Sequence, residues 1–355
     1  NGIGMSNDEV IENLGTIAHS GTKEFIARAQ EADVKNNPEL IGQFGVGFYA
    51  SFMVADEVIV ETKSHNNKAV KWKSKGTGNF TISESEKNDR GTTITLFLKD
   101  DAKEFLNDWT IRSTVKKFSD YLEHPVTLIS KTKDEKTQIE EEKEEQINSQ
   151  KAIWLRKKSE VKKDEYNEFY KHLSHDMNNP SEIIHYNAEG AIEFKALLFI
   201  PEKRPFDMMT NHDPKAHLNL YVQRVFISNE FDNLLPGYLR FVKGVVDSSD
   251  LPLNVSREIL QENPLLDKIR TNLVNRIFKT LNQMKEKNYE KFKLFHEEFS
   301  SILKEGLQSD WSNKEKIADL LLFESSSKNA GEKISLSDYV ENMADDQAEI
   351  FYLAG

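Results

Sequence analysis

Hydrophobic and polar positions along the first third of the chain predict a small sheet with helices. Short alternating runs predict strands at 58–60, 70–72, 80–82 and 92–98, and the alternation is strongest in the last run. Ser6 and Glu9 have the spacing of a capping box, which predicts a helix that ends at Gly15. A second helix follows residues 20–22, and a helix near 111–122 and a strand at 126–129 come last. This order predicts one sheet covered on one face by helices.

The pattern after residue 150 predicts a second region with strands first and helices later. A helix is expected at 164–173, strands at 192–200 and 218–227, and a further helix after a cap at Ser256. A long helix follows, and further helix is expected up to Leu307 before a small mixed unit. One face of the long helix carries a regular apolar stripe, made of Leu266, Ile269, Leu273, Ile277 and Leu281.

Residues 131–150 separate these two regions and have a different character. Their charged run includes five glutamates between Glu140 and Glu145, and such a run cannot bury a core. We interpret it as a solvated linker, and an exposed charged helix is the alternative. The sequence therefore predicts an α+β protein with domains at 1–130 and 151–355, joined by a linker at 131–150.

Composition narrows the classes of function. The 355 residues are 30% charged and 38% hydrophobic, which is typical of a globular protein with a polar surface. A net charge of −12 and the lack of a basic patch argue against nucleic acid as a partner. The absence of cysteine excludes a disulfide framework and thiolate chemistry. No apolar run reaches the length of a membrane span, and no signal peptide opens the chain.

Glycines at 42, 45 and 47 form the most informative motif, G-x-x-G-x-G, and a second pair stands at Gly2 and Gly4. Such turns let backbone N–H groups face phosphate oxygens. A P-loop would need Lys and Ser or Thr where the chain has Phe48 and Tyr49.

Two other interpretations of the motif compete with a phosphate turn. The dinucleotide fingerprint fits better than a P-loop, with Ala50 and Glu61 at the expected spacings, but Pro38 and Gly42 argue against the buried strand that it requires. A purely structural glycine turn is the remaining alternative.

Five motifs that follow one another along the chain favour a phosphate-binding turn over a purely structural one. They are 1–5, 13–18, 20–23, 42–48 and 90–92. This set resembles the ATPase domain shared by gyrase, histidine kinases, mismatch-repair proteins and the 90-kDa heat-shock chaperones. Within that superfamily the chain is similar to the chaperone family, because 204–207, 241–248 and 250–258 resemble its middle domain. The resemblance implies an α/β sandwich of that ATPase type, incomplete at its start, followed by an α/β middle domain with a helical segment.

The resemblance also implies a role for each matching position in an ATP site. Gly4 and Met5 would line the adenine side, Asn13 would reach the sugar and α-phosphate, and Thr92 would contact the base through water. A lid at 15–43 would fold over the nucleotide. His19 stands in the lid where the family usually has Lys or Arg, so a surface position is the alternative for it. The remaining nucleotide-binding residues would be Ser20 and Gly21 in the lid and Gly45, Val46, Gly47 and Phe48 around the phosphates.

Arg257 is the candidate catalytic residue of the second domain. Ser256 is expected to cap its helix, and Gln261 lies one turn further on the same face. An exposed helical arginine is the alternative. The resemblance implies that Arg257 neutralises charge on the transferred γ-phosphate, as arginine fingers do, with Asn254 and Gln261 holding the catalytic loop.

The resemblance implies that several functional groups lie outside this sequence. The adenine-binding Asp, the water-activating Glu and the magnesium-holding Asn of the family would precede Asn1, so no metal ligand is expected in this chain. The chain starts without Met and stops at 351–355 in a strand-like pattern, so we expect an internal fragment that hydrolyses ATP weakly and is mostly monomeric.

The parent protein is expected to use ATP and Mg²⁺, to dimerise through a C-terminal domain, and to act on partly folded client proteins. The short linker favours a bacterial cytoplasm, with an organelle second. Two alternatives remain open: a type II topoisomerase or mismatch-repair ATPase, and a non-catalytic scaffold that only binds partners.

Two weaker groups complete the candidates. His172 and His175 are three residues apart on a predicted helix, where a solvated face is favoured over a metal site. Four large side chains could form an adaptable surface for unfolded partners, with an ordinary core position as the alternative: Trp154, Phe206, Met208 and Met209.

Overall fold

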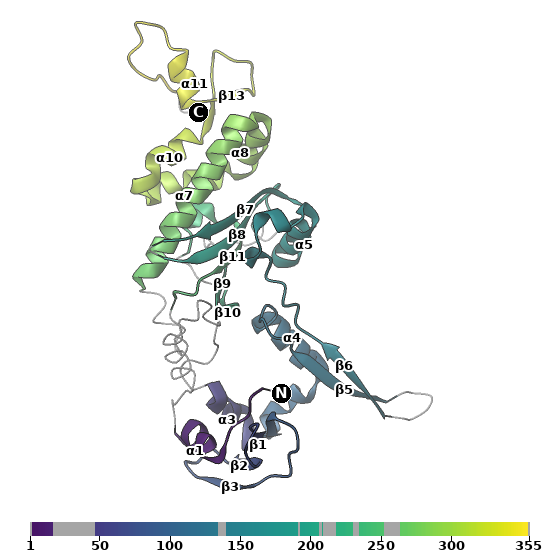
Figure 1. Ribbon diagram of the computed structural model, residues 1–355. Helices are drawn as coiled ribbons and strands as arrows, with labels where there is room; N and C mark the ends of the chain where they lie inside the picture. The colour runs from purple at the N-terminus through teal and green to yellow at the C-terminus, as the bar shows by residue number, and fades with distance from the viewer. Residues whose placement is uncertain are drawn as a thin grey trace. The chain divides into compact units, whose positions relative to one another are not determined.

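The computed structural model divides the chain into two compact units. Unit 1 comprises 1–116 and 129–144, and unit 2 comprises 117–128 and 145–355. The predicted helices at 22–29 and after Ser256 fall outside the part of the chain that the structure describes. That part consists of residues 2–16, 47–133, 140–190, 192–205, 208, 218–229, 234–251 and 263–353 (Figure 1).

Unit 1 contains a four-stranded antiparallel sheet with the strand order β3-β2-β1-β4. The four predicted strands are confirmed, and each is longer than predicted. The strands are β1 (Ala55–Lys63), β2 (Val70–Ser74), β3 (Phe80–Glu84) and β4 (Gly91–Leu98). The helical elements are α1 (Asn7–Gly15), η1 (Gly47–Ala50), α3 (Ser51–Val54), η2 (Asp100–Leu106) and α4 (Asp108–Phe118), whose last residues lie in unit 2.

The capping box at the start of α1 is confirmed. The Ser6 hydroxyl accepts a hydrogen bond from the Glu9 backbone N–H, and the Glu9 carboxylate accepts one from the Ser6 N–H. These bonds satisfy two of the N–H groups that a helix start leaves without partners. Val10 of α1 is fully buried against Val58, Val60 and Trp72, so the helix covers one face of the sheet as the pattern predicted.

Strand β4 is confirmed, but several of its apolar side chains are exposed. Its apolar residues Ile94, Leu96 and Phe97 are 50%, 38% and 49% exposed. Among the described strands β4 lies at the edge of the sheet and pairs only with β1. The alternation therefore gave the correct strand, but the face that it marked is not buried by the described residues.

The charged run between the two predicted domains forms a strand, where we expected a linker or an exposed helix. β5 (Thr127–Lys133) pairs with β6 (Glu140–Gln146) in a two-stranded sheet. Glu142, Lys143 and Glu144 are exposed, so their charges stay in water while the backbone hydrogen bonds are satisfied by pairing.

Unit 2 is built on a five-stranded mixed sheet with the order β10-β9-β11-β8-β7, in which only β9 and β11 run parallel. Its strands are β7 (Pro180–Ala188), β8 (Phe194–Pro201), β9 (Asn219–Val222), β10 (Val225–Ser228) and β11 (Lys243–Asp247). Helical elements near the sheet are η3 (Ile153–Leu155), η4 (Lys158–Glu160), α5 (Lys163–Ser174), η5 (Gly237–Leu239), α7 (Pro264–Lys287) and α8 (Tyr289–Lys304). The mixed unit at the end contains α9 (Gly306–Ser309), η7 (Trp311–Asn313), α10 (Lys314–Asp319), β12 (Leu322–Glu324), β13 (Lys333–Ser335) and α11 (Leu336–Glu341).

The sheet of unit 2 lies between two helical layers, and β8 shows why. Its side chains alternate, so Leu198 packs into the core with α7 and α8 while Phe199 packs with α5 and η3 on the other face. All five residues of the predicted stripe on α7 are buried in the first of these cores. The long helix was therefore predicted correctly, together with its buried face.

One predicted strand is a hairpin. Residues 218–227 form β9 and β10, joined by a two-residue turn at Gln223 and Arg224, whose φ angles are +50° and +65°. A two-residue hairpin turn with positive φ at both positions is of type I′, and Gly or Asn usually marks it. Neither residue occurs here, so the turn carries no signal in the sequence.

The proposed adaptable surface is not supported where it can be checked. Trp154 is fully buried, and its indole N–H donates to the Asp247 carboxylate at 2.9 Å. Met208 is partly buried and packs against the main core of unit 2. Phe206 and Met209 lie outside the described residues. Among the described helices, none combines the length and the apolar character needed to cross a membrane.

Candidate functional site

Gly4 stands where the chain touches the end of strand β1. Its φ is +70°, and a Cβ at this position would lie 1.9 Å from the Lys63 carbonyl oxygen. Both the left-handed backbone and the close approach exclude a side chain. The glycine therefore lets residues 2–5 pass directly over the end of the strand.

The next residue, Met5, is held by a threonine that the sequence analysis did not select. The Met5 backbone N–H donates to the Thr62 hydroxyl at 2.9 Å. Thr62 is completely buried on β1 and is paired across the strands with Thr92 on β4. The two hydroxyl oxygens are 2.9 Å apart, and the Gly91 carbonyl lies 3.4 Å from the Thr62 oxygen.

The hydrogen-bond capacity of Thr62 limits what Thr92 can do. A hydroxyl has one proton to donate and two lone pairs that accept. Thr62 already accepts from Met5, and the bond to Thr92 is much shorter than the contact with the Gly91 carbonyl. If Thr62 donates to Thr92, the half-buried Thr92 hydroxyl keeps its own proton for a ligand or a water. This arrangement suits a group that recognises a polar edge, such as that of a base.

Asn13 lies in the last turn of α1 and is half-buried. Its side-chain N–H₂ donates to the Glu9 carbonyl one turn earlier at 2.9 Å. This bond holds the side chain along the helix.

The described end of the glycine motif is anchored by aromatic side chains. The Phe48 ring packs edge-on against Trp72, with ring centroids 5.6 Å apart, and also contacts Tyr49 and Phe52. The Tyr49 hydroxyl donates to the Leu14 carbonyl at the end of α1, and burial raises the pKa of that hydroxyl. Gly47, directly before this anchor, is exposed. Its backbone is therefore held in place while remaining open to solvent.

The structure brings together about half of the predicted nucleotide site. Gly4, Met5 and Thr92 meet at Thr62, and Phe48 is linked to the end of α1 near Asn13 through Tyr49. The other predicted site residues lie outside the described residues: Ser20, Gly21, Gly45, Val46, Asn254, Arg257 and Gln261, as well as His19 and most of the lid at 15–43.

Thr62 has a signal in the sequence that could have identified it. It follows Val58 and Val60 at the spacing of two residues that marks one face of a strand. Its polar side chain therefore points to the covered face of β1. A hydroxyl at such a position must find partners. The identity of those partners depends on the register of β1 with β4, which the sequence does not contain.

The sheet excludes the dinucleotide fingerprint as an interpretation of the glycines. That fold requires a parallel sheet with the motif directly after a strand. Every strand pair of the described sheet in unit 1 is antiparallel, and Glu61, the candidate ribose ligand, accepts a hydrogen bond from Ser85.

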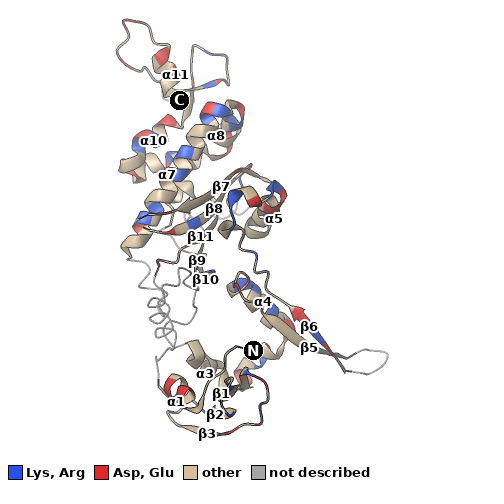
Figure 2. Ribbon diagram, in the orientation of Figure 1, with Lys and Arg blue, Asp and Glu red and all other residues tan. Residues whose placement is uncertain are grey.

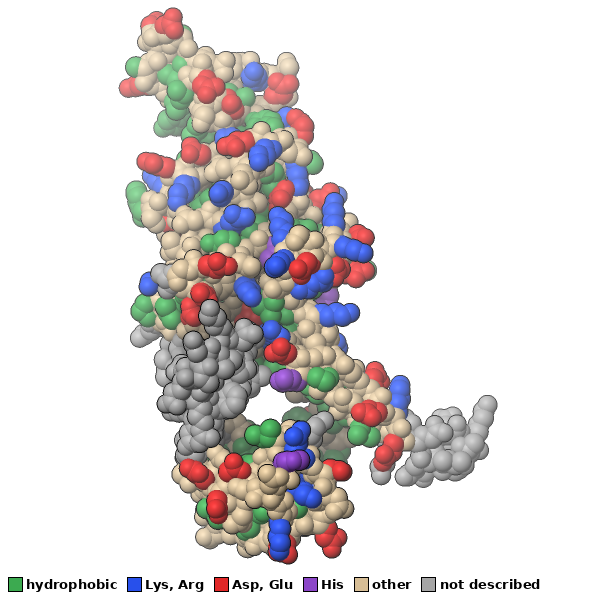
Figure 3. All heavy atoms as spheres, in the orientation of Figure 1, with side chains coloured by type: hydrophobic (Ala, Val, Ile, Leu, Met, Phe, Trp, Pro, Cys, Tyr) green, Lys and Arg blue, Asp and Glu red, His purple; other side chains and the backbone are tan. Residues whose placement is uncertain are grey.

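Charges are dispersed over both units. Asp8, Glu9 and Glu12 make α1 acidic, α7 carries mostly basic residues, and α8 carries residues of both signs (Figure 2). On the face shown in Figure 3, the two signs are interspersed and do not gather into a basic patch. His172 and His175, the weaker metal candidates, are both exposed at the end of α5.

Comparison with known proteins assigns both regions to families. Residues 1–88 match the family described as "Histidine kinase-, DNA gyrase B-, and HSP90-like ATPase", and residues 130–355 match the family described as "Hsp90 protein". Among relatives, a "Chaperone protein HtpG" from Geobacter sulfurreducens is 52% identical over 369 aligned residues and covers 100% of this chain. Proteins of the same name from Aliivibrio fischeri and Pectobacterium atrosepticum are each 48% identical over 99% of the chain.

These relatives are much longer than the chain. The alignments cover 57% of the Geobacter protein, 56% of the Aliivibrio protein and 57% of the Pectobacterium protein. The chain thus spans somewhat more than half the length of each of these relatives.

Proposed function

The chain belongs to the Hsp90 family, and from this premise we propose that the full-length protein is an ATP-dependent chaperone for partly folded client proteins. The α+β fold and the family resemblance predicted from the sequence are confirmed. The proposed function of the whole protein goes beyond family membership, and it rests on one observation on the chain itself. Three predicted nucleotide-binding residues, Gly4, Met5 and Thr92, converge on the buried hydroxyl of Thr62.

We assign the adenine end of the nucleotide to this convergence. The Gly4–Met5 backbone would pack on the base, and the Thr92 hydroxyl would donate to its polar edge directly or through water. Thr62 would be a positioning residue, since it is buried beneath both groups. The arrangement is formed by hydrogen bonds within unit 1, so we expect it to exist before ATP binds.

The phosphate end would be formed by Gly45, Val46, Gly47 and Phe48, closed by the lid at 15–43. The support from the described residues is the aromatic anchor of Phe48, which holds the adjacent Gly47 in an exposed position. Mg²⁺ would accompany the triphosphate and neutralise part of its charge. Among the described residues there is no group of three His, Asp or Glu side chains that could hold a metal, and we assign no protein ligand to the ion.

We propose that Arg257 stabilises charge on the γ-phosphate during transfer, with Asn254 and Gln261 positioning its loop. A guanidinium is always protonated and offers several N–H donors, so it suits an oxyanion in the transition state. This role would make hydrolysis depend on domain docking, because Arg257 belongs to unit 2 and the nucleotide site to unit 1.

We further propose dimerisation through a C-terminal domain and a location in a bacterial cytoplasm. The bacterial organisms of the relatives support the bacterial source, and dimerisation is carried over from the family resemblance. No observation on the chain favours a topoisomerase or a mismatch-repair protein, whose second domains differ from the Hsp90 segment matched by residues 130–355.

The test compares nucleotide affinity and steady-state ATP turnover of the full-length protein with those of its Arg257→Ala variant. We expect near-normal affinity and turnover reduced by about a thousandfold, because an arginine finger acts on the transition state. Arg257→Lys keeps the charge but not the fork of donors, and it should retain an intermediate rate. A large loss of affinity with unchanged turnover at saturation would instead show that Arg257 serves ground-state binding.

A further inference from the structure

A polar cavity of about 680 Å³ lies in unit 2, within the part of the chain that the structure describes and apart from the proposed nucleotide site. One wall is a face of α7, on which Asp267, Arg270 and Asn275 line the space. The opposite wall consists of η5 and of the segment from Ser309 to Lys316. Its volume is within the range of small-molecule sites in proteins.

The acidic group of the second wall cannot serve a cationic ligand, because its acceptor positions are occupied. Asp310 accepts from the Tyr238 hydroxyl at 2.7 Å and from the Asn313 side chain at 2.9 Å on one oxygen. Its other oxygen accepts from the Ser312 hydroxyl and the Asn313 backbone N–H. A carboxylate has about four such positions.

The protonation state of Asp310 agrees with this structural role. Burial raises the pKa of its carboxyl group, but the hydrogen bonds from Asn313, Ser312 and Tyr238 outweigh burial and hold the pKa below its usual value. Asp310 therefore fixes the wall of the cavity as a charged, fully bonded group.

The basic groups of the cavity, in contrast to Asp310, keep hydrogen-bonding capacity for a ligand. Lys316 donates to the side-chain oxygens of Asn275 at 2.9 Å and Asn313 at 3.1 Å, so its ammonium contacts two neutral amides and keeps a third N–H. No hydrogen bond or ion pair joins Arg270 to another residue in the part of the chain that is described. Its five N–H donors remain available.

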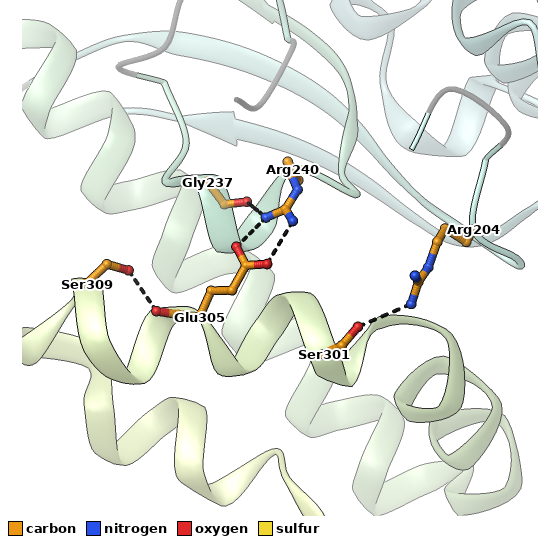
Figure 4. Close-up of polar contacts among 6 residues, drawn as sticks. All are labelled: Arg204, Gly237, Arg240, Ser301, Glu305 and Ser309. Atoms are coloured by element: carbon orange, nitrogen blue, oxygen red, sulfur yellow. Dashed lines mark hydrogen bonds and ion pairs between the residues drawn. The ribbon is translucent and has the colours of Figure 1, made fainter. Parts of the chain in front are cut away.

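A neighbouring arginine shows what a paired guanidinium looks like here. Arg240 donates to both carboxylate oxygens of Glu305, at 2.5 and 2.8 Å, and to the Gly237 carbonyl at 2.9 Å (Figure 4). This bidentate pair is complete and structural. Arg270, half-buried on the wall formed by α7, lacks such an acceptor.

The two basic groups are separated along α7. Lys316 contacts the helix at Asn275, and an α-helix rises about 1.5 Å per residue, so this contact and Arg270 are about 7 to 8 Å apart along the axis. The two basic groups thus meet the cavity at different levels of the helix, and a molecule with two anionic groups can contact both. The hydroxyl-bearing residues Thr271, Ser309 and Ser312 also line the cavity.

We propose that this cavity binds a small organic molecule with an anionic group at each end, one on Arg270 and one on Lys316. Carboxylates and phosphates share this chemistry, and both accept from a guanidinium in bidentate geometry. Asp267, three residues before Arg270 and exposed at the edge of the cavity, limits the affinity by repelling the ligand.

The experiment is isothermal titration calorimetry on the whole chain with two probes, a hexose bisphosphate and the dicarboxylate adipate. We expect at least one probe to bind with one-to-one stoichiometry and with an affinity that falls as salt is added. Binding of only the bisphosphate assigns the site to phosphates, and binding of only adipate assigns it to carboxylates.

Three variants decide whether the bound probe is in this cavity. Arg270→Gln and Lys316→Gln should each weaken binding by about 10- to 100-fold, since each removes charged hydrogen bonds. Asp267→Asn should strengthen it severalfold. Lys279→Gln, which removes an exposed charge elsewhere on α7, is the matched control and should leave the affinity unchanged.

The proposal fails if neither probe binds. It also fails if Arg270→Gln binds the probe as tightly as the wild type and the control Lys279→Gln do. Thermal melts of all variants identify any that are misfolded. If Arg270→Gln or Lys316→Gln is misfolded, Asp267→Asn, a substitution at an exposed position, provides the deciding comparison. An unchanged affinity in that variant overturns the proposal.

Discussion

The hydroxyl oxygens of Thr62 and Thr92 lie 2.9 Å apart on paired strands of the sheet in unit 1. Thr62 is buried and also accepts the backbone N–H of Met5, whereas Thr92 is half-buried. The buried threonine therefore connects the glycine turn at the start of the chain with the strand that carries the proposed base contact.

Replacing these two threonines with valine should have different consequences. Thr62→Val leaves the Met5 N–H without an acceptor and should lower the free energy of unfolding by about 1 to 3 kcal/mol. It should also weaken nucleotide binding, because both Met5 and Thr92 lose their fixed positions. Thr92→Val should weaken binding with little effect on stability. Denaturant unfolding and nucleotide titration of the full-length protein measure the two quantities.

Thr95→Val is the matched control for this pair, since Thr95 is exposed on the same strand as Thr92. It should change neither quantity. Normal nucleotide affinity in both Thr62→Val and Thr92→Val would show that the adenine end of the nucleotide does not bind at this position.

Gly4→Ala should abolish nucleotide binding and destabilise unit 1. A left-handed φ costs a residue with a side chain about 1 to 2 kcal/mol, and the added Cβ would also overlap the Lys63 carbonyl, which must move. Gly78→Ala is the control, because Gly78 has a φ of +90° but open space around it. It should show only the backbone cost and bind nucleotide normally. Equal losses in both variants would mean that the contact with Lys63 is unimportant.

The sequence predicted elements whose signal is local. The capping box of Ser6 and Glu9 and the apolar stripe of α7 are patterns within one turn or one helix face, and both were found as predicted. The hairpin at Gln223 and Arg224 was missed, because its positive φ angles occur without glycine or asparagine. The strand β6 was missed because its glutamates have a low strand propensity, which pairing with β5 overcomes.

The site was predictable only as far as its residues lie in motifs. Gly4, Met5 and Thr92 belong to glycine-containing motifs and were selected. Thr62 stands in an ordinary strand, and its role arises from its register opposite Thr92. Long-range pairing of this kind is decided by the folded sheet and leaves little trace in a single sequence.

Unit 2 should lose stability as the pH falls from about 6.5 to 4, in part through His296. Burial lowers the pKa of this imidazole from 6.5 to about 4, and Lys333 and Lys304 add to the effect. The folded state therefore keeps His296 neutral while the unfolded chain takes up a proton. The contribution is complete above pH 6.5, and at pH 4 about 3 kcal/mol of it is lost.

Urea unfolding between pH 4 and 7 measures this dependence. His296→Gln should flatten the profile in this range, because glutamine does not titrate and its amide oxygen can accept the Leu322 N–H that His296 now accepts at 2.9 Å. His172→Gln, at an exposed position on α5, should leave the profile as it is in the wild type. A profile of His296→Gln that parallels the wild type would assign the acid sensitivity to other groups.

The buried hydrogen bond between Trp154 and Asp247 should couple the effects of substitutions at the two residues. The indole N–H donates to the carboxylate at 2.9 Å, and both side chains are shielded from water. Trp154→Phe leaves the carboxylate with one donor fewer and should cost unit 2 about 2 to 3 kcal/mol, because losing a bond to a buried charge is expensive. In Asp247→Asn an amide oxygen can still accept the bond, so the cost of Trp154→Phe should be smaller in that background.

Denaturant unfolding of the four proteins in this double-mutant cycle gives the coupling energy, for which we expect about 1 to 2 kcal/mol. A coupling energy near zero would show that the two side chains stabilise the core by packing alone.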